Sequence, residues 1–185
     1  MDMNLGDTQL ILSECKRAGL SVKHTAYVLA TAKWETNHTM KPVREAYWLS
    51  EDWRRKNLHY YPWYGRGYVQ LTWEENYIAA GRKLSLDLTT DPDVVMKPTT
   101  AAKILVQGMR GGWFTTKKMS DYTNYEDMRR VVNGTDKAKD IADIARQYEA
   151  VLVGSDRPVA KPVASSGLLQ SFFAFLARIF GGAPK

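Results

Sequence analysis

The sequence has a single cysteine, Cys15, among its 185 residues. An intrachain disulfide is therefore excluded, which suits a protein made in a reducing cytoplasm. The first ten residues, MDMNLGDTQL, have neither a basic start nor an apolar run. We therefore expect no signal peptide.

Sequence motifs for metal and phosphate chemistry are also absent. The chain has three histidines and contains neither HExxH nor CxxC, so the ligands of a zinc site are not predicted. The segment Gly65-Arg66-Gly67 lacks the length and the lysine of a phosphate-binding loop. No GxSxG nucleophile motif occurs. We predict no metal and no organic cofactor.

The balance of charge is basic, with a formal net charge of +6. A basic surface favours anionic partners such as nucleic acid, acidic polysaccharide or a phosphate-bearing membrane. The only conspicuous basic run, WRRK at residues 53–56, is short. That run is more typical of a solvated helix face than of a nucleic-acid patch, and we expect no nucleic-acid partner.

Helix signals outnumber strand signals along residues 1–154. Ser21 and Ser50 stand where N-caps are expected, and Gly19 where the first helix stops. The pattern predicts a mainly α domain with a minor β element. The predicted helices cover residues 8–17, 22–37, 50–56, 73–84, 98–110, 125–132 and 136–153.

The composition changes after residue 154. Residues 155–167 contain two prolines and no periodic apolar positions, which predicts a linker. Residues 168–185 would form an amphipathic helix and tail, and the apolar side chains of 168–180 fill one arc of roughly 160°. This helix is too short to cross a bilayer, so it either docks on the domain or lies in a lipid interface such as the bacterial outer membrane. The membrane-facing candidates are Phe172, Phe173, Leu176, Ile179 and Phe180.

Residues 63–73, WYGRGYVQLTW, predict a strand after a glycine corner. Side chains alternate between the two faces of a strand. The apolar face would carry Val69, Leu71 and Trp73, and the polar face Tyr68, Gln70 and Thr72. The alternation itself leaves open whether the polar face meets bulk water or lines a binding cleft.

Two glutamates are candidates for acid and base chemistry. Glu35 follows Trp34 at the end of an alanine-rich helix, where an apolar setting would disfavour its ionised form and make it a proton donor. Glu45 follows Arg44, whose charge would favour the ionised form of a nearby carboxylate. Two carboxylates in unlike settings suit glycoside hydrolysis. The spacing alone favours two ordinary surface glutamates.

Residues 64–73, YGRGYVQLTW, followed by Asn76-Tyr77, resemble the signature YGRGPIQLSW…NY of glycoside hydrolase family 19. That family holds plant-type chitinases and many phage endolysins. Residues 34–36, WET, resemble its His-Glu-Thr motif, and residues 132–134, VNG, its Ile-Asn-Gly segment. The resemblance covers about residues 20–150. It implies a lysozyme-like fold, in which two helical lobes and a small sheet surround a central cleft.

The resemblance also implies roles for individual residues. Glu35 would be the general acid, Glu45 the general base, and Thr72 the group that holds the attacking water. Glu51 and Asp52 stay open as alternative bases. Family members invert the anomeric carbon, and this needs room for a water between the carboxylates. The substrate-binding candidates are Tyr64, Arg66, Gln70, Asn76 and Asn133.

The missing cysteines and the nine-residue spacer between the two glutamates resemble the phage or prophage endolysin branch more than plant chitinases. The expected partner is then the β-1,4 glycan of peptidoglycan, whose anionic groups suit the basic charge. We expect a monomer that stays in the bacterial host cytoplasm until its release to the wall. The alternatives are a chitinase acting on the neutral polymer and a non-catalytic wall-binding or membrane-active module. The sequence does not distinguish N-acetylmuramidase from N-acetylglucosaminidase cleavage.

Overall fold

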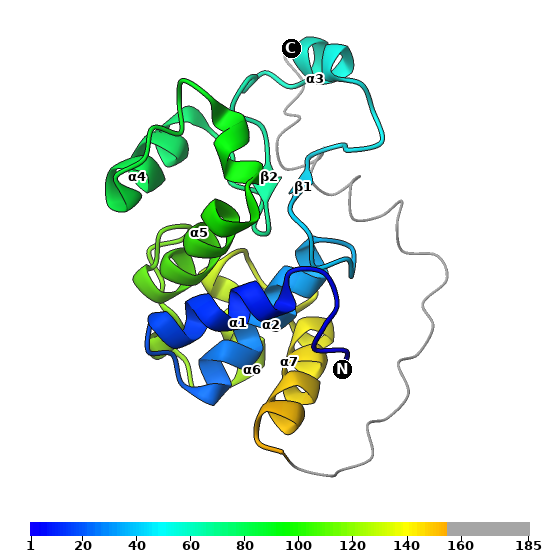
Figure 1. Ribbon diagram of the computed structural model, residues 1–185, viewed down its shortest axis with the longest axis vertical. Helices are drawn as coiled ribbons and strands as arrows, with labels where there is room; N and C mark the ends of the chain where they lie inside the picture. The colour runs from blue at the N-terminus through cyan, green and yellow to red at the C-terminus, as the bar shows by residue number, and fades with distance from the viewer. Residues whose placement is uncertain (155–185) are drawn as a thin grey trace.

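The computed structural model describes residues 1–154, drawn in colour in Figure 1. The predicted linker at 155–167 and the predicted amphipathic segment at 168–185 lie outside the described residues. The prediction of a mainly α fold with a minor β element is confirmed. The α-helices are α1 (Thr8–Arg17), α2 (Val22–Glu35), α3 (Glu51–Asn57), α4 (Glu74–Leu84), α5 (Pro98–Gly111), α6 (Tyr125–Met128) and α7 (Ala138–Leu152). The short 3-10 helices are η1 (Pro92–Met96), η2 (Met119–Asp121) and η3 (Arg129–Val131), and the strands are β1 (Val43–Arg44) and β2 (Arg66–Gly67).

Local capping chemistry starts two of the helices. The Ser21 hydroxyl accepts a hydrogen bond from the backbone N–H of His24, and the Ser50 hydroxyl accepts one from Trp53. Both predicted N-caps are therefore confirmed. Helix α2 ends two residues earlier than predicted, because Asn37 adopts a left-handed conformation with φ of 50°. As a result, Glu35 stands in the last helical turn.

The helices gather in two regions, as Figure 1 shows. Helices α1, α2, α5, α6 and α7 form the lower region, while α3, α4 and the two strands lie in the upper one. Helix α2 packs mainly against α7, and α1 against α5. The buried core of the lower region includes Ile11, Tyr27, Leu29, Leu105 and Tyr148. None of the helices described in residues 1–154 has both the length and the apolar character that a membrane span requires.

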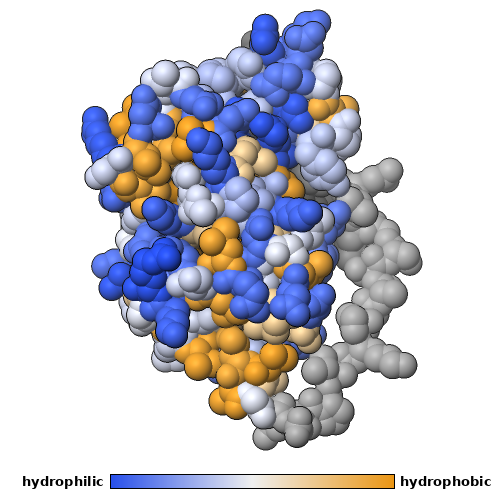
Figure 2. Space-filling model, viewed as in Figure 1, coloured by the Kyte–Doolittle hydropathy of each residue, from blue (hydrophilic) through white to orange (hydrophobic). Residues whose placement is uncertain are grey.

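Hydrophilic side chains cover most of the face seen in Figure 2. Apolar patches interrupt them near α4 and at the lower end of the molecule. Exposed apolar side chains in the described chain include Leu86 after α4, and Val22 and Val153.

The strand predicted over residues 68–73 is wrong, because the chain turns back on itself there. Strand β2 pairs antiparallel with β1 and is followed directly by a reversal. The backbones of Arg66 and Leu71 exchange two hydrogen bonds, of 3.2 and 2.9 Å, across residues 67–70. Gly67, with φ of 86°, and Gln70, with φ of 54°, adopt the left-handed conformations that this reversal needs. The segment is a tight hairpin next to a two-stranded sheet.

The predicted polar face fails for the same reason, whereas Val69 and Leu71 of the predicted apolar face are buried as expected. Tyr68 was expected on a polar face, but its residue is completely buried, and its hydroxyl donates to Asp7 Oδ2 at 2.7 Å. Val69 beside it is also buried. Asp7 stands at the start of α1, so this hydrogen bond fixes the hairpin to the lower helical region.

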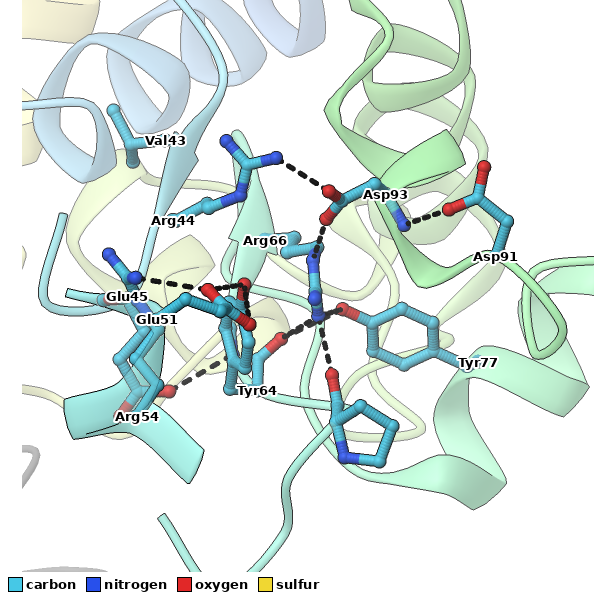
Figure 3. A network of polar contacts seen from close by, with 12 residues as sticks. Val43, Arg44, Glu45, Glu51, Arg54, Tyr64, Arg66, Tyr77, Asp91 and Asp93 are labelled. Carbon is cyan, nitrogen blue, oxygen red and sulfur yellow. Dashed lines mark hydrogen bonds and ion pairs between the residues drawn. The ribbon is translucent and has the colours of Figure 1, made fainter. Parts of the chain in front are cut away.

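A network of charged side chains supports the hairpin from α3 and η1 (Figure 3). The Arg66 guanidinium is buried, with Nε 2.8 Å from Asp93 Oδ1, and it lies 3.6 Å from the centroid of the Tyr64 ring. Arg44 on β1 reaches the other oxygen of Asp93 at 2.7 Å. The Tyr64 hydroxyl donates to Glu51 at 3.0 Å. Asp93 thus joins both strands to η1.

We predict that Asp93→Asn lowers the unfolding free energy by about 1–2 kcal/mol at pH 7, a value reduced by the half-exposure of the Asp93 side chain. The Tm should fall by roughly 3–6 °C. Burial alone would raise the pKa of Asp93, but the hydrogen bonds and charges of Arg44 and Arg66 outweigh burial and hold the pKa below its ordinary value of 3.8.

The stabilisation by Asp93 is therefore present above pH 3.8 and is lost as the pH falls through the lower pKa of the folded protein. Thermal unfolding of the wild type and of Asp93→Asn from pH 7 to pH 2 should show the two Tm curves converging at acid pH. Asp140→Asn, an exposed position on α7, serves as the control. Parallel curves for Asp93→Asn would contradict this role.

Candidate active site

Glu35 is held in a buried ion pair. Its Oε1 lies 2.7 Å from Nη1 of Arg129, and the two side chains are 7% and 1% exposed. Arg129 begins η3 and also donates from Nε to the backbone carbonyl of Asp136 at 3.0 Å. The expectation of a purely apolar setting for Glu35 is wrong, because its carboxyl group is paired with a buried guanidinium.

Arg129 also connects Glu35 with Asn133. The backbone N–H of Asn133 donates to the carbonyl of Arg129 at 3.0 Å, and the Asn133 side-chain oxygen accepts from the backbone of Gly134 at 2.8 Å. The Arg129 side chain reaches the backbone carbonyl of Asp136, seven residues further on. Glu35 thus contacts the side chain of Arg129, whereas Asn133 contacts its backbone carbonyl.

Glu45 is held by uncharged donors instead. It follows β1, and its backbone N–H donates to the carbonyl of Gly65 at 2.7 Å. Its Oε2 accepts from the backbone N–H of Gly65 at 3.0 Å, and its Oε1 accepts from the Tyr60 hydroxyl at 2.6 Å. The expected influence of Arg44 on Glu45 is not seen, because Arg44 is turned toward Asp93.

Tyr60 is a site residue that the sequence reasoning missed. Burial, followed by the hydrogen bond to Glu45 and its charge, raises the pKa of the Tyr60 hydroxyl above its ordinary value. Tyr60 therefore stays protonated and keeps donating to Glu45. Its ring contacts Trp73 and His59, with centroid distances of 4.8 and 4.7 Å. The aromatic richness of residues 59–64 was the only local signal for this position.

Gly65 brings Gln70 and Glu45 together. A side chain at Gly65 would place its Cβ 2.8 Å from Gln70 Oε1 and 3.3 Å from Glu45 Oε2, so a larger residue there would require the Gln70 amide to shift. The Gln70 amide donates to the carbonyl of Val43 on β1 at 3.1 Å. The Thr72 hydroxyl donates to the carbonyl of Gln70 at 2.8 Å.

Asn76 extends this group by one turn of α4. Its side-chain amide donates to the carbonyl of Thr72 at 2.8 Å, and the residue is exposed. Two clusters of predicted residues result. Glu35 and Asn133 share Arg129, whereas Glu45, Gln70, Thr72 and Asn76 surround the hairpin.

Tyr64 and Arg66 were predicted to bind substrate, but the structure places both inside the supporting network. They are 1% and 3% exposed, and the polar groups of each are bonded to the protein. An influence of these two residues on substrate would act through the hairpin that they hold. Of the alternative bases, Glu51 accepts from Tyr64 and pairs with Arg54 at 3.1 Å, while Asp52 is exposed on α3.

The arrangement gives no support for a metal-binding role. Within residues 1–154, no three His, Cys, Asp or Glu side chains gather closely enough to hold a metal ion. What the site offers chemically is two carboxylates with different partners, together with hydroxyl and amide groups at the hairpin.

Comparison with known proteins identifies the family. The family model described as chitinase class I, glycoside hydrolase family 19, matches residues 30–137, which is more than half of the chain. This chain belongs to glycoside hydrolase family 19. The matched range contains both glutamates, the hairpin, Arg129 and Asn133.

Individual family members are similar over shorter stretches. The basic endochitinase CHB4 of Brassica napus is 30% identical over 121 residues, which are 60% of this chain and 42% of that protein. An endochitinase of Arabidopsis thaliana is 52% identical over 40 residues, or 22% of this chain and 14% of the relative. The chain thus spans less than half the length of these curated relatives.

The solved structure of a chitinase has a similar fold. Chitinase C from Streptomyces griseus HUT6037 superposes with a TM-score of 0.56 at 21% identity, covering 71% of this chain and 60% of that chain. The predicted lysozyme-like fold of the family is confirmed.

The buried pair gives a prediction about stability. Arg129→Gln should lower the unfolding free energy by about 3–5 kcal/mol, because Glu35 is left buried without its cation. The double variant Glu35→Gln/Arg129→Gln should lose less than the sum of the two single changes, by about 1–3 kcal/mol, because no unpaired charge remains. Denaturant unfolding at pH 7 measures all three variants.

Arg130→Gln is the matched control. Arg130 is the next residue along the chain, its side chain is 44% exposed, and its Nε lies 3.9 Å from Asp127 Oδ1. We expect its effect to stay within about 0.5 kcal/mol. Strict additivity between the changes at 35 and 129 would show that the pair does not stabilise the fold as a unit.

Proposed function

We propose that this family 19 protein is an endolysin, a lysozyme-type enzyme that hydrolyses β-1,4 glycosidic bonds of bacterial peptidoglycan and lyses the host cell. The observation that carries the proposal is that two carboxylates, both within the family match at residues 30–137, are held in place by different partners. Glu35 is paired with the buried Arg129. Glu45 is bound by Tyr60 and Gly65, beside Gln70 and the hairpin that carries Thr72.

In the proposed reaction, Glu35 gives its proton to the leaving glycosidic oxygen while Glu45 takes a proton from an attacking water. The water adds to the anomeric carbon from the opposite face, the glycosidic bond breaks, and the configuration inverts. Thr72 would help to place the water. As the proton leaves Glu35, negative charge develops on its carboxylate, and the adjacent Arg129 stabilises that charge.

The basic character of the chain supports peptidoglycan as the substrate. A net charge of +6 favours a polymer with carboxylates over a neutral one. Chitin is the second candidate, because the named relatives are chitinases and endochitinases. Mass spectrometry of the reducing-end sugars released from purified peptidoglycan and from chitin oligomers would decide between the two polymers and identify the bond that is cut.

We predict that Glu35→Gln and Glu45→Gln each lower turnover on purified peptidoglycan by at least about 100-fold, because each removes a proton-transfer group. The assay counts new reducing ends at a temperature below the Tm of every variant, because Glu35→Gln also breaks the pair with Arg129. Glu75→Gln, exposed on α4, is the control and should keep wild-type turnover.

Full turnover by Glu35→Gln would overturn the assignment of the acid. If Glu45→Gln keeps near-normal turnover while Glu51→Gln or Asp52→Asn loses it, the base is one of the α3 residues. Binding of peptidoglycan by the wild type without new reducing ends would favour a non-catalytic wall-binding module.

We further propose that the segment 168–180, outside the described residues, engages a lipid surface such as the bacterial outer membrane through its apolar arc. A chain ending at Gly154 should keep its activity on bare peptidoglycan and lose action on whole cells that have an outer membrane. The full-length variant Phe173→Ser/Leu176→Ser should behave like the truncated chain. Equal loss on bare wall and whole cells would indicate a segment that docks on the domain.

A further inference from the structure

Tyr60 contacts the proposed base directly. The residue is 6% exposed, and its hydroxyl donates to Oε1 of Glu45 at 2.6 Å. The backbone N–H of Gly65 donates to the other carboxylate oxygen at 3.0 Å. Because each oxygen accepts from a donor that the fold holds in place, rotation of the carboxylate about its last side-chain bond would break both hydrogen bonds. Glu45 therefore has one defined orientation.

These two donors leave acceptor sites for a water molecule. An ionised carboxylate has about four such sites, two on each oxygen. In the described part of the chain, Tyr60 and Gly65 use one site on each oxygen of Glu45. The second site on each oxygen can accept a hydrogen bond from the water that the base is proposed to deprotonate.

Trp73 holds Tyr60 in place through its ring and its backbone. The two ring centroids lie 4.8 Å apart. The Trp73 N–H donates to the carbonyl of Trp63 at 2.8 Å, and the Trp63 N–H donates to the carbonyl of Tyr60 at 2.8 Å. The turn that carries the Tyr60 hydroxyl is thereby fixed to the residue that starts α4.

The backbone of Trp73 is itself strained. Its φ of 76° and ψ of 139° lie where residues other than glycine are rarely found. Such conformations persist only where surrounding contacts impose them, and they are concentrated at functional sites. Trp73 directly follows Thr72, the residue proposed to place the water, and packs on Tyr60, which holds Glu45. One strained residue thus adjoins both groups that would contact the water.

Packing alone does not account for the hydroxyl of Tyr60. A phenylalanine would present the same ring to Trp73 and to His59, whose ring centroid lies 4.7 Å away. A buried hydroxyl lowers stability unless it is hydrogen-bonded, and this one is bonded to the carboxylate of Glu45. The polar atom therefore serves the contact with Glu45 rather than the core.

We propose that Tyr60 is a positioning residue of the hydrolysis, whose hydroxyl keeps the Glu45 carboxylate in the orientation that accepts a proton from the attacking water. The inference rests on the proposed function and deepens it. The proton passes from the water to Glu45, and Tyr60 neither gives nor takes a proton in the reaction.

Removal of the hydroxyl tests this role. On the glycan that the wild type cuts, purified peptidoglycan or chitin oligomers, Tyr60→Phe should lower kcat about 10- to 100-fold, because a misplaced catalytic group slows the reaction steeply. KM should change less than about twofold, since substrate binding is not affected. Tyr61→Phe is the matched control, because Tyr61 is the next residue and its ring stacks on Tyr64 at a centroid distance of 6.1 Å. It should keep the wild-type kcat, and an equally unchanged kcat in Tyr60→Phe would overturn the proposal.

A double-variant cycle separates positioning of the base from a general effect on the fold. If Tyr60 acts through Glu45, Tyr60→Phe should change the residual turnover of Glu45→Gln less than about twofold. An equal loss in the wild type and in Glu45→Gln would mean that Tyr60 only supports the fold, which would overturn the proposal. All assays are run below the Tm of every variant.

Crystal structures of the wild type and of Tyr60→Phe measure the orientation of Glu45 without any turnover. In Tyr60→Phe the carboxylate should turn away from the Gly65 N–H or occupy two conformations. An unchanged carboxylate would overturn the positioning role, even where the wild type hydrolyses glycan and the proposed function stands. A displaced carboxylate in Tyr60→Phe, with a wild type that cuts neither glycan, would refute the proposed hydrolysis and leave the orienting contact standing.

Discussion

The fold of the lower helical region depends on one buried ion pair. Arg129 and Glu35 are both almost completely removed from water, and such charges are tolerated only when geometry and further hydrogen bonds compensate for lost hydration. Arg129 meets this condition by binding Glu35 and the carbonyl of Asp136 together. The end of α2 and the segment before α7 are therefore fixed relative to each other, and the proposed acid is placed by the same contact that packs these two helices.

The hairpin fixes the second carboxylate by a different physical means. Glu45 receives one O–H and one N–H donor, and the Gly65 backbone that supplies the N–H also closes the sheet beside it. The two groups that contact the Glu45 carboxylate are uncharged, whereas the Glu35 carboxylate contacts the positively charged guanidinium of Arg129. Inverting hydrolysis needs one carboxylate as acid and another as base, and the protein gives the two carboxylates different partners, an ion pair for one and uncharged donors for the other.

The sequence predicted what is decided locally. The caps at Ser21 and Ser50 and the approximate helix ranges follow from short-range hydrogen bonds and periodicity. The hairpin was mistaken for a strand because its reversal depends on contacts with β1 and Asp7, remote in sequence. Arg129 was missed because 94 residues separate it from Glu35, and no pattern around it marks it as different from Arg130. The family motif located the glutamates, but not the groups that hold them.

The two-residue strand β1 connects the supporting ion-pair network with the proposed base. Its backbone receives the amide of Gln70 and leads directly into Glu45, while Arg44 turns to the opposite face. Asp93 holds Arg44 and the buried Arg66 at once, so the carboxylate that stabilises the hairpin also sets the orientation of the exposed guanidinium. Because Glu45 directly follows β1, the position of the proposed base depends on the same short strand that the Asp93 ion pairs hold against η1.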